Sequence, residues 1–505
     1  MGLGSRGGKP MHGRTSIKPA AAEKKVSVAK KVSAVKKVSR LSTKRTVARV
    51  ALTQSLAEGD PRQGLDYVNV FLWEWVYETP FEPGPGGRVA AGLLQLPEPS
   101  GEALIASVTP GKLFSDGTPV SAALIVDSLR HCETFKEIAG ADVNGSRVVL
   151  RPRRPSPGFA QQLVGMHYLV GKNGPDGKIL GTGPYRFASD STSSRPHLVR
   201  NEHAPNAKGP DEIWGTLCAA GGDSRQLIDA LRRGDLDYCD ALSAAEAREL
   251  NDFRCISTVP DATAFLFFNV TAPGLWMRDV RAALAKAINC QAYARAVFGE
   301  ERAAAVGLLA PLFGINAPGR HRFDPARGAA ELRALKPRAA LRTPLRLLMP
   351  GASRPHTPNV PAASEAIVKM LRVIGVAVEP ILPASTAEFA RIAEAGTYDL
   401  AVSGWNPESL VASDVLEAVL ASTSIPRPTR SVANCSNLAR FGNIELDLAL
   451  AKAANSGSVS DMVAVQELVD QHVPLVPLAC GGRTVVVRRG LDLPKRSSTG
   501  RNFDL

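Results

Sequence analysis

Short apolar runs alternate with segments of helical spacing from residue 47 onward, and this alternation constrains the fold more than any other feature. Such alternation is typical of α/β layers. A chain of 505 residues is also too long to fold around a single ordinary hydrophobic core, so we predict several lobes. The predicted strands are 47–54, 68–72, 103–108, 147–150, 264–270, 345–349, 376–381 and 485–487, and the predicted helices are 121–131, 224–233, 278–288, 363–374 and 461–471.

The excess positive charge is confined to the start of the chain. Residues 1–49 hold 14 Lys and Arg against one acid, Glu23, which leaves 47 basic and 47 acidic residues in the remainder of a chain of net charge +13. Residues 1–45 lack Phe, Trp and Tyr and repeat Lys-Lys-Val-Ser with a six-residue period. This composition cannot pack a core, so we predict a disordered, Lys-rich tail over residues 1–45.

Three roles for the tail stay open. It could bind nucleic acid nonspecifically, it could be attracted to anionic lipid, or it could be an inert extension or the product of a misassigned start codon. No apolar run of the length found in signal peptides follows its basic residues. The compartment is therefore left open between an extracytoplasmic and a cytoplasmic location.

The sequence lacks the common motifs of enzymes and metal sites. The seven cysteines are scattered without a CxxC pair, and the eight histidines are isolated. The chain contains no HExxH, GxSxG or GxxxxGK[ST] motif. We therefore expect a protein that is not an enzyme and has no catalytic residues, no metal and no cofactor. The chain contains no run of 18 apolar residues, so we predict no membrane span.

The segment Gly181-Thr182-Gly183-Pro184-Tyr185-Arg186-Phe187 predicts a tight turn followed by a strand. Two glycines and a proline within four positions fix the backbone path. The segment lacks the GxGxxG spacing and is followed by a β-like pattern, so it is not a phosphate-binding loop.

Further segments follow in an order that resembles one known family. Asp116-Gly117 predicts a turn, and Ser121 is a suitable N-cap for the helix after it. Together with 181–187, these segments resemble the family 5 extracellular solute-binding proteins, the peptide and nickel receptors of ABC importers. The resemblance covers about 47–505 and rests on 112–122 with 126–129, 201–211, 230–237, 267–269 with 278–288, 396–400 with Gly404-Trp405, and 473–478.

The resemblance implies an α/β, periplasmic-binding-protein-like fold (type II, cluster C) with two large lobes, a hinge and a small extra lobe. Chain segments that cross the hinge make the lobes discontinuous. The expected boundaries are 46–85, 180–270 and 477–505 for lobe I, 86–179 for the small lobe, and 271–476 for lobe II.

The resemblance also places candidate ligand-binding residues after the Gly-Trp pair. Peptide-binding members have an Asp there that captures the amino terminus of the ligand, and Glu408 occupies the corresponding position. A carboxylate can form a charge-assisted hydrogen bond with an ammonium group. The alternative is that Glu408 is a solvated loop residue. Trp405 either lines the pocket or packs between the lobes.

Other candidates come from the strand ends and from an aromatic cluster. Asn269, at a predicted strand end next to the hinge, binds either the ligand backbone or a turn. Strand alternation would put Trp73, Trp75 and Tyr77 on one face, where they bind ligand or, as we favour for at least two of them, pack in the core.

Two functions follow from these features. The first is a monomeric binding protein that encloses an oligopeptide or another amine-bearing metabolite and presents it to an ABC permease. The second is a cytoplasmic sensor or carrier with the same fold, whose tail docks to nucleic acid or a partner. Fold analogy alone fixes neither the ligand nor the compartment.

Overall fold

The computed structural model describes most of the chain after the Lys-rich tail, and the tail itself and Glu408 lie outside the described residues. The described ranges are 46–53, 55–63, 70–84, 88–100, 102–154, 156–175, 177–204, 209–218, 224–257, 260–299, 304–339, 341–351, 353–407, 409–427, 436–482, 484–494, 496–498 and 501–503.

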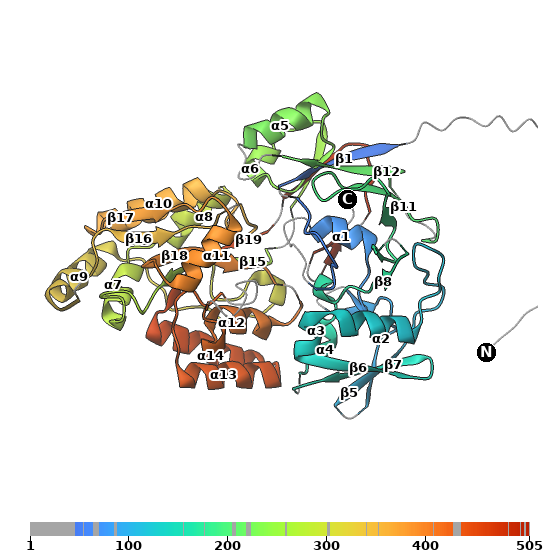
Figure 1. The fold of residues 1–505 in the computed structure, drawn as a ribbon. Helices are drawn as coiled ribbons and strands as arrows, with labels where there is room; N and C mark the ends of the chain where they lie inside the picture. Colours follow the sequence, from blue (N-terminus) through green and yellow to red (C-terminus); the bar gives the residue numbers. More distant parts are fainter. Residues whose placement is uncertain are drawn as a thin grey trace, which may run out of the picture. The chain divides into compact units, whose positions relative to one another are not determined.

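A seven-stranded mixed sheet, with β1 near its centre, forms the first large lobe (Figure 1). β1 pairs in parallel with β12 and β13, and its residues Ala48, Val50 and Leu52 are fully buried. Helices α1 (Val70–Val76), α5 (Ser224–Arg233) and α6 (Ala244–Ala247) supply side chains to its cores. The strand order is β10 (Tyr185–Phe187), β11 (His197–Arg200), β12 (Glu212–Leu217), β1 (Val47–Leu52), β13 (Tyr238–Cys239), β20 (Thr484–Arg488) and β14 (Phe253–Ser257).

A five-stranded sheet forms the second large lobe, with helices on both of its faces. All seven residues of its strand β15 are buried, as expected for a strand covered on both sides. Leu266 and Phe268 face one core, and Phe265 and Phe267 face the other. The strand order is β17 (Val378–Ile381), β16 (Leu345–Leu348), β18 (Leu400–Trp405), β15 (Ala262–Phe268) and β19 (Leu475–Gly481).

The helices of this lobe divide between the two cores. The first core takes side chains from α7 (Arg278–Ala285), α8 (Cys290–Phe298), α9 (Pro325–Ala339) and α10 (Val360–Val373). The second takes them from α11 (Thr386–Ala395), α12 (Ala412–Leu420), α13 (Ile444–Ser456) and α14 (Val459–His472).

A four-stranded antiparallel sheet packed against helices forms the small lobe. Ser121 caps its main helix by accepting a hydrogen bond from the backbone N–H of Leu124 at 3.3 Å, which confirms the predicted cap. The elements of the small lobe are β4 (Glu98–Ser100), β5 (Ala103–Ser107), β7 (Arg147–Pro152), β6 (Ala139–Asn144), α2 (Ala122–His131), α3 (Glu133–Ile138) and α4 (Phe159–Gln162).

The remaining described strands form three separate two-stranded pairs. These are β2 (Phe81–Pro83) with β3 (Val89–Ala91), β8 (Lys172–Asn173) with β9 (Ile179–Leu180), and β21 (Arg496–Ser498) with β22 (Arg501–Phe503).

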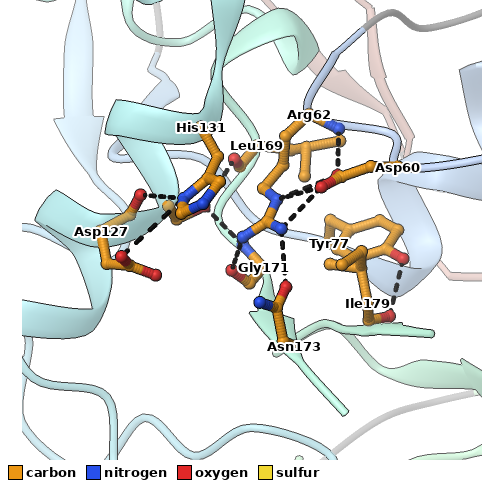
Figure 2. Close-up of polar contacts among 10 residues, drawn as sticks. Asp60, Arg62, Tyr77, Asp127, His131, Leu169, Gly171, Asn173 and Ile179 are labelled. Atoms are coloured by element: carbon orange, nitrogen blue, oxygen red, sulfur yellow. Dashed lines mark hydrogen bonds and ion pairs between the residues drawn. The ribbon is translucent and has the colours of Figure 1, made fainter. Parts of the chain in front are cut away.

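A buried arginine ties an early loop of the chain to residues 171–173 near the end of the small lobe (Figure 2). The Arg62 side chain is 2% exposed and forms an ion pair with Asp60 at 2.6 Å. Its guanidinium also donates to the carbonyl oxygen of Gly171 at 3.1 Å and to Asn173 Oδ1 at 2.7 Å. The charge is therefore paired and each of the three guanidinium nitrogens donates a hydrogen bond, which is the arrangement that makes a buried ion tolerable.

The turn at 181–187 is the junction between the small lobe and the seven-stranded sheet. Its carbonyl at Gly181 accepts from the N–H of Ser115, and Gly183 donates to the carbonyl of Val76. A Cβ at Gly181 would lie 2.0 Å from that same carbonyl oxygen. The two turn motifs predicted from the sequence thus contact each other, and no side chain fits at Gly181.

The chain crosses between the two large sheets at two neighbouring places. β14 leads into β15 and β19 leads into β20, while β14 pairs with β20 and β15 pairs with β19. The last pair before the crossing is Ser257 with Thr484, and the first pair after it is Ala262 with Gly481. Two short connections side by side are the usual form of a hinge.

Two expectations from the sequence need correction. Residues 68–72 were predicted as a strand, but the structure has helix α1 over Val70–Val76, because a short apolar run does not distinguish the two by itself. The predicted boundary at residue 270 assigned β15 to lobe I, whereas β15 belongs to the five-stranded sheet. The division of the chain into lobes at the predicted boundaries otherwise stays a proposal.

Candidate functional site

A pocket lies beside the two crossings and is lined by residues of both large sheets. The first sheet contributes Thr53, which follows β1, and Asp240, which follows β13. The second contributes Asn406, which follows β18, and Arg354 from the loop 353–358. Side chains at the ends of strands from two lobes are a common setting for a ligand site.

Two glycines allow the loop 353–358 to lie against the end of the five-stranded sheet. A Cβ at Gly404 would lie 2.6 Å from the ring Cγ of His356, and a Cβ at Gly481 would lie 2.2 Å from the carbonyl oxygen of Pro355. Both distances are too short for any side chain. The glycines therefore bring Arg354 to the pocket edge.

Groups of opposite charge line this pocket. Among the described lining residues, Asp240 is the acid and Arg354 is the base, and the rest are polar or apolar neutral residues. Arg354 comes from the loop against the five-stranded sheet, and Asp240 comes from the seven-stranded sheet. A ligand with an ammonium group and a carboxylate would match both.

His356 lies behind the pocket in an uncharged state. Its side chain contacts Asn406, with 3.4 Å between His356 Nδ1 and Asn406 Oδ1, and the residue is 6% exposed. Burial, together with the charge of Arg354, lowers the pKa of His356 to about 3. The imidazole is therefore neutral at any physiological pH.

Of the predicted site residues, Trp405 lies closest to this pocket in the chain. It ends strand β18, is half-buried and packs against the core on that side of the sheet, and the next residue, Asn406, lines the pocket. Glu408 lies outside the described residues, so its role stays a prediction.

Asn269 is not brought together with Trp405. Trp405 pairs with Thr263, whereas Phe268 pairs with Leu400, so Asn269 lies beyond the opposite end of β15, about 17 Å or more away at the rise of a strand. The expectation that Asn269 lies next to the hinge is therefore wrong. Its amide donates to the carbonyls of Gly396 and Tyr398, at 3.2 and 2.8 Å. These bonds support the alternative that Asn269 stabilises a turn.

The three aromatic residues of the early cluster lie in a core. Trp73, Trp75 and Tyr77 are 5%, 0% and 3% exposed. Because Trp73 and Trp75 belong to helix α1, they do not share a face as strand alternation would require. Trp73 stacks on Tyr77, four positions later, and the Tyr77 hydroxyl donates to the carbonyl of Ile179 at 2.9 Å (Figure 2).

Sequence reasoning missed the residues that form the pocket. Arg354 and Asp240, which line the pocket, carry no motif of their own, and His356, which lies behind it, was counted among isolated histidines. The available signal was Gly404, because a glycine at the end of a buried strand often marks the close approach of another segment. The described residues include no cluster of His, Cys, Asp and Glu suited to a metal ion. None of the described helices is long and apolar enough to cross a bilayer.

Comparison with known proteins gives the family context of this pocket. Residues 108–426 match the family model described as bacterial extracellular solute-binding proteins, family 5, middle region. A similar curated protein is the probable ABC transporter periplasmic-binding protein SapA of Escherichia coli K12, 26% identical over 62% of this chain and 56% of that protein. The peptide transport periplasmic protein SapA of Salmonella typhimurium is 24% identical over 72% of this chain and 67% of its own length. The match to the first of these relatives thus spans less than two thirds of it.

Solved structures share the fold at low sequence identity. The dipeptide-binding protein of Pseudoalteromonas sp. SM9913, in complex with Met-Leu, has a TM-score of 0.76 and 17% identity, covering 90% of this chain and 98% of that one. The periplasmic binding protein DppA of Helicobacter pylori, in complex with the peptide STSA, has a TM-score of 0.72 and 16% identity over 90% and 96% of the two chains. These likenesses confirm the predicted two-lobed α/β fold.

Proposed function

Because this chain belongs to the bacterial extracellular solute-binding proteins of family 5, we propose that it captures a small peptide or another amine-bearing metabolite for uptake by an ABC transporter. The names of the curated relatives support transport over the alternative of a cytoplasmic sensor. The family consists of binding proteins, and we extend this to the proposal that the chain captures its ligand without transforming it.

The pocket beside the two crossings carries this proposal. The described residues that line it include the acid Asp240, from the first lobe, and the base Arg354, from the second. A ligand that bears both an ammonium group and a carboxylate can interact with the two lobes at once. Such a ligand binds the closed arrangement better than the open one, and this difference in affinity is what drives closure around a hinge.

The test is a calorimetric titration of the purified protein with the dipeptide Met-Leu, together with native mass spectrometry of protein from its own host. The expected result is a one-to-one complex and a co-purified ligand with an amine. Arg354→Gln and Asp240→Asn should each weaken binding about tenfold or more, because each removes a hydrogen bond to a charged group. Absence of any amine-bearing ligand in both measurements would refute the proposal.

Matched control variants are available on the same lobes. Arg372→Gln changes an exposed arginine in the last turn of α10, and Asp229→Asn changes an exposed acid on α5. Neither residue is among those that line the pocket. Both controls should bind Met-Leu as the wild type does, which separates an effect of the pocket from a general effect of charge.

Glu408 remains a further candidate for the ammonium group. It follows the pocket residue Asn406 by two positions. We propose that Glu408→Gln weakens an amine-bearing ligand by about 1.5–3 kcal/mol, the range for hydrogen bonds to charged groups. Comparing Glu408→Gln with Asp240→Asn in the same titration identifies which acid is the main anchor.

A further inference from the structure

His356 and Asn406 form a polar pair behind the proposed ligand pocket. Asn406 lines the pocket, and its Oδ1 lies 3.4 Å from His356 Nδ1. His356 is buried, and its ring packs where Gly404 has no side chain. The imidazole therefore has little room to turn, and Asn406 is the residue through which it can affect a ligand.

The position of the ring hydrogen decides which way the amide of Asn406 faces. His356 Nε2 has no hydrogen-bond partner among the described residues. A hydrogen on Nε2 would be a buried donor without an acceptor, which is costly and rare, whereas an unpaired acceptor nitrogen is less so. The hydrogen therefore belongs on Nδ1, where it is donated to Asn406 Oδ1.

We propose that His356 is a positioning residue that holds the amide oxygen of Asn406 and leaves the amide N–H groups for the ligand. This inference rests on the proposed function of the pocket. With its oxygen held, Asn406 offers donors beside the guanidinium of Arg354, and the two together select a ligand group with oxygen acceptors, a carboxylate above all. His356 thereby sets which end of a zwitterionic ligand lies at the five-stranded sheet.

The first test needs no ligand. The ring nitrogens of a histidine have different ¹⁵N chemical shifts with and without hydrogen, so NMR of ¹⁵N-histidine-labelled protein at pH 7 reports the tautomer. The signals of His356 are identified by their loss in His356→Asn. The expected result is a neutral ring with hydrogen on Nδ1. A ring with hydrogen on Nε2 would overturn the proposal, because Nδ1 would then accept from the amide and turn its oxygen to the ligand.

The second test measures selectivity with Met-Leu and its C-terminal amide. His356→Asn keeps a donor close to the position of Nδ1, whereas His356→Phe keeps the aromatic shape without a donor. The ratio of the two affinities should fall about tenfold in His356→Phe and stay near the wild-type value in His356→Asn. An unchanged ratio in His356→Phe would overturn the role in selectivity.

The two tests separate this inference from the proposed function. A wild type that binds neither Met-Leu nor its amide would count against the peptide ligand, while the tautomer would still decide the orientation of Asn406. A loss of fold in His356→Phe would show as lost dispersion in the NMR spectrum. The tautomer test uses only the wild type and His356→Asn. It therefore gives its result even if His356→Phe does not fold.

Discussion

Replacing His356 should make the protein less sensitive to acid. The pKa of His356 is about 3 in the folded protein because the side chain is buried, and 6.5 is the ordinary value that applies when the chain unfolds. Between these two values the unfolded chain binds a proton that the folded protein does not. The stability contributed by this site is therefore present above pH 6.5 and is lost progressively as the pH falls toward 3.

The size of the effect follows from the gap between the pH and the unfolded value. At pH 5 the gap is about 1.5 units, and each unit is worth about 1.4 kcal/mol, so His356 costs about 2 kcal/mol of unfolding free energy relative to pH 7.5. His356→Asn and His356→Phe both remove the titrating group. Each variant should lose about 2 kcal/mol less than the wild type over this interval.

The assay is urea unfolding at pH 7.5 and pH 5.0, followed by fluorescence, for the wild type and both variants. Each variant will also differ from the wild type at pH 7.5 because its packing has changed. The informative quantity is the change with pH, in which packing effects and the titration of distant groups cancel. If the wild type and both variants lose the same free energy between the two pH values, His356 is not a buried neutral histidine and the reasoning fails.

Three further changes test other parts of the structure. Gly181→Ala should destabilise the protein by about 3 kcal/mol, because the new Cβ would lie 2.0 Å from a backbone oxygen. The control is Gly140→Ala, which has open space around it and should change the free energy of unfolding by less than about 1 kcal/mol. Urea unfolding measures both variants. Arg62→Met removes the buried partner of Asp60, whose side chain is 23% exposed and partly hydrated, and should cost about 1–3 kcal/mol in the same assay. Burial and a neighbouring acid raise the pKa of Glu417 to about 7, so the folded state loses stability as the pH rises from 4.5 through 7; Glu417→Gln should reduce this loss, measured as a smaller fall in Tm between pH 5 and pH 8.

Much of the secondary structure could be predicted because periodicity is a local property. The predicted helix 224–233 matches α5, and the helix after Ser121 matches α2 with its cap. The prediction over 68–72 was wrong at 70–72, because this run is too short for its pattern to separate a strand from a helix, and only the structure shows that Val70–Val76 is helical. The local sequence pattern thus predicts a helix or strand correctly when one of its faces is apolar and the other is polar.

Sheet membership could not be read in the same way. Strand β15 is apolar except for Thr263, so its sequence indicates burial on both faces but does not indicate which strands lie beside it. Its partners β18 and β19 lie more than a hundred residues later in the chain. The boundary of lobe I was placed one strand too late for this reason.

The candidate site illustrates the same limit at the level of single residues. The resemblance made Trp405 a candidate for the pocket, which stays a prediction: Trp405 ends strand β18, and the described residues that line the pocket include its neighbour Asn406 but not Trp405 itself. Arg354 and Asp240 are separated by more than a hundred residues and meet only through the ends of two sheets. The sequence around Arg354 therefore gives no sign of Asp240, and the sequence around Asp240 gives no sign of Arg354.

The Gly-Trp pair has a structural role that its position in the sequence does not reveal. In the sequence it served as one block of a resemblance and as the reference point for Glu408 and Trp405. In the structure a Cβ at Gly404 would meet the carbonyl of Thr263 at 2.3 Å and the ring of His356 at 2.6 Å. The glycine is therefore required for His356 to reach Asn406, and through Asn406 to reach the pocket. Gly404→Ala should accordingly disturb ligand selectivity as His356→Phe does, although residue 404 lines no part of the pocket itself.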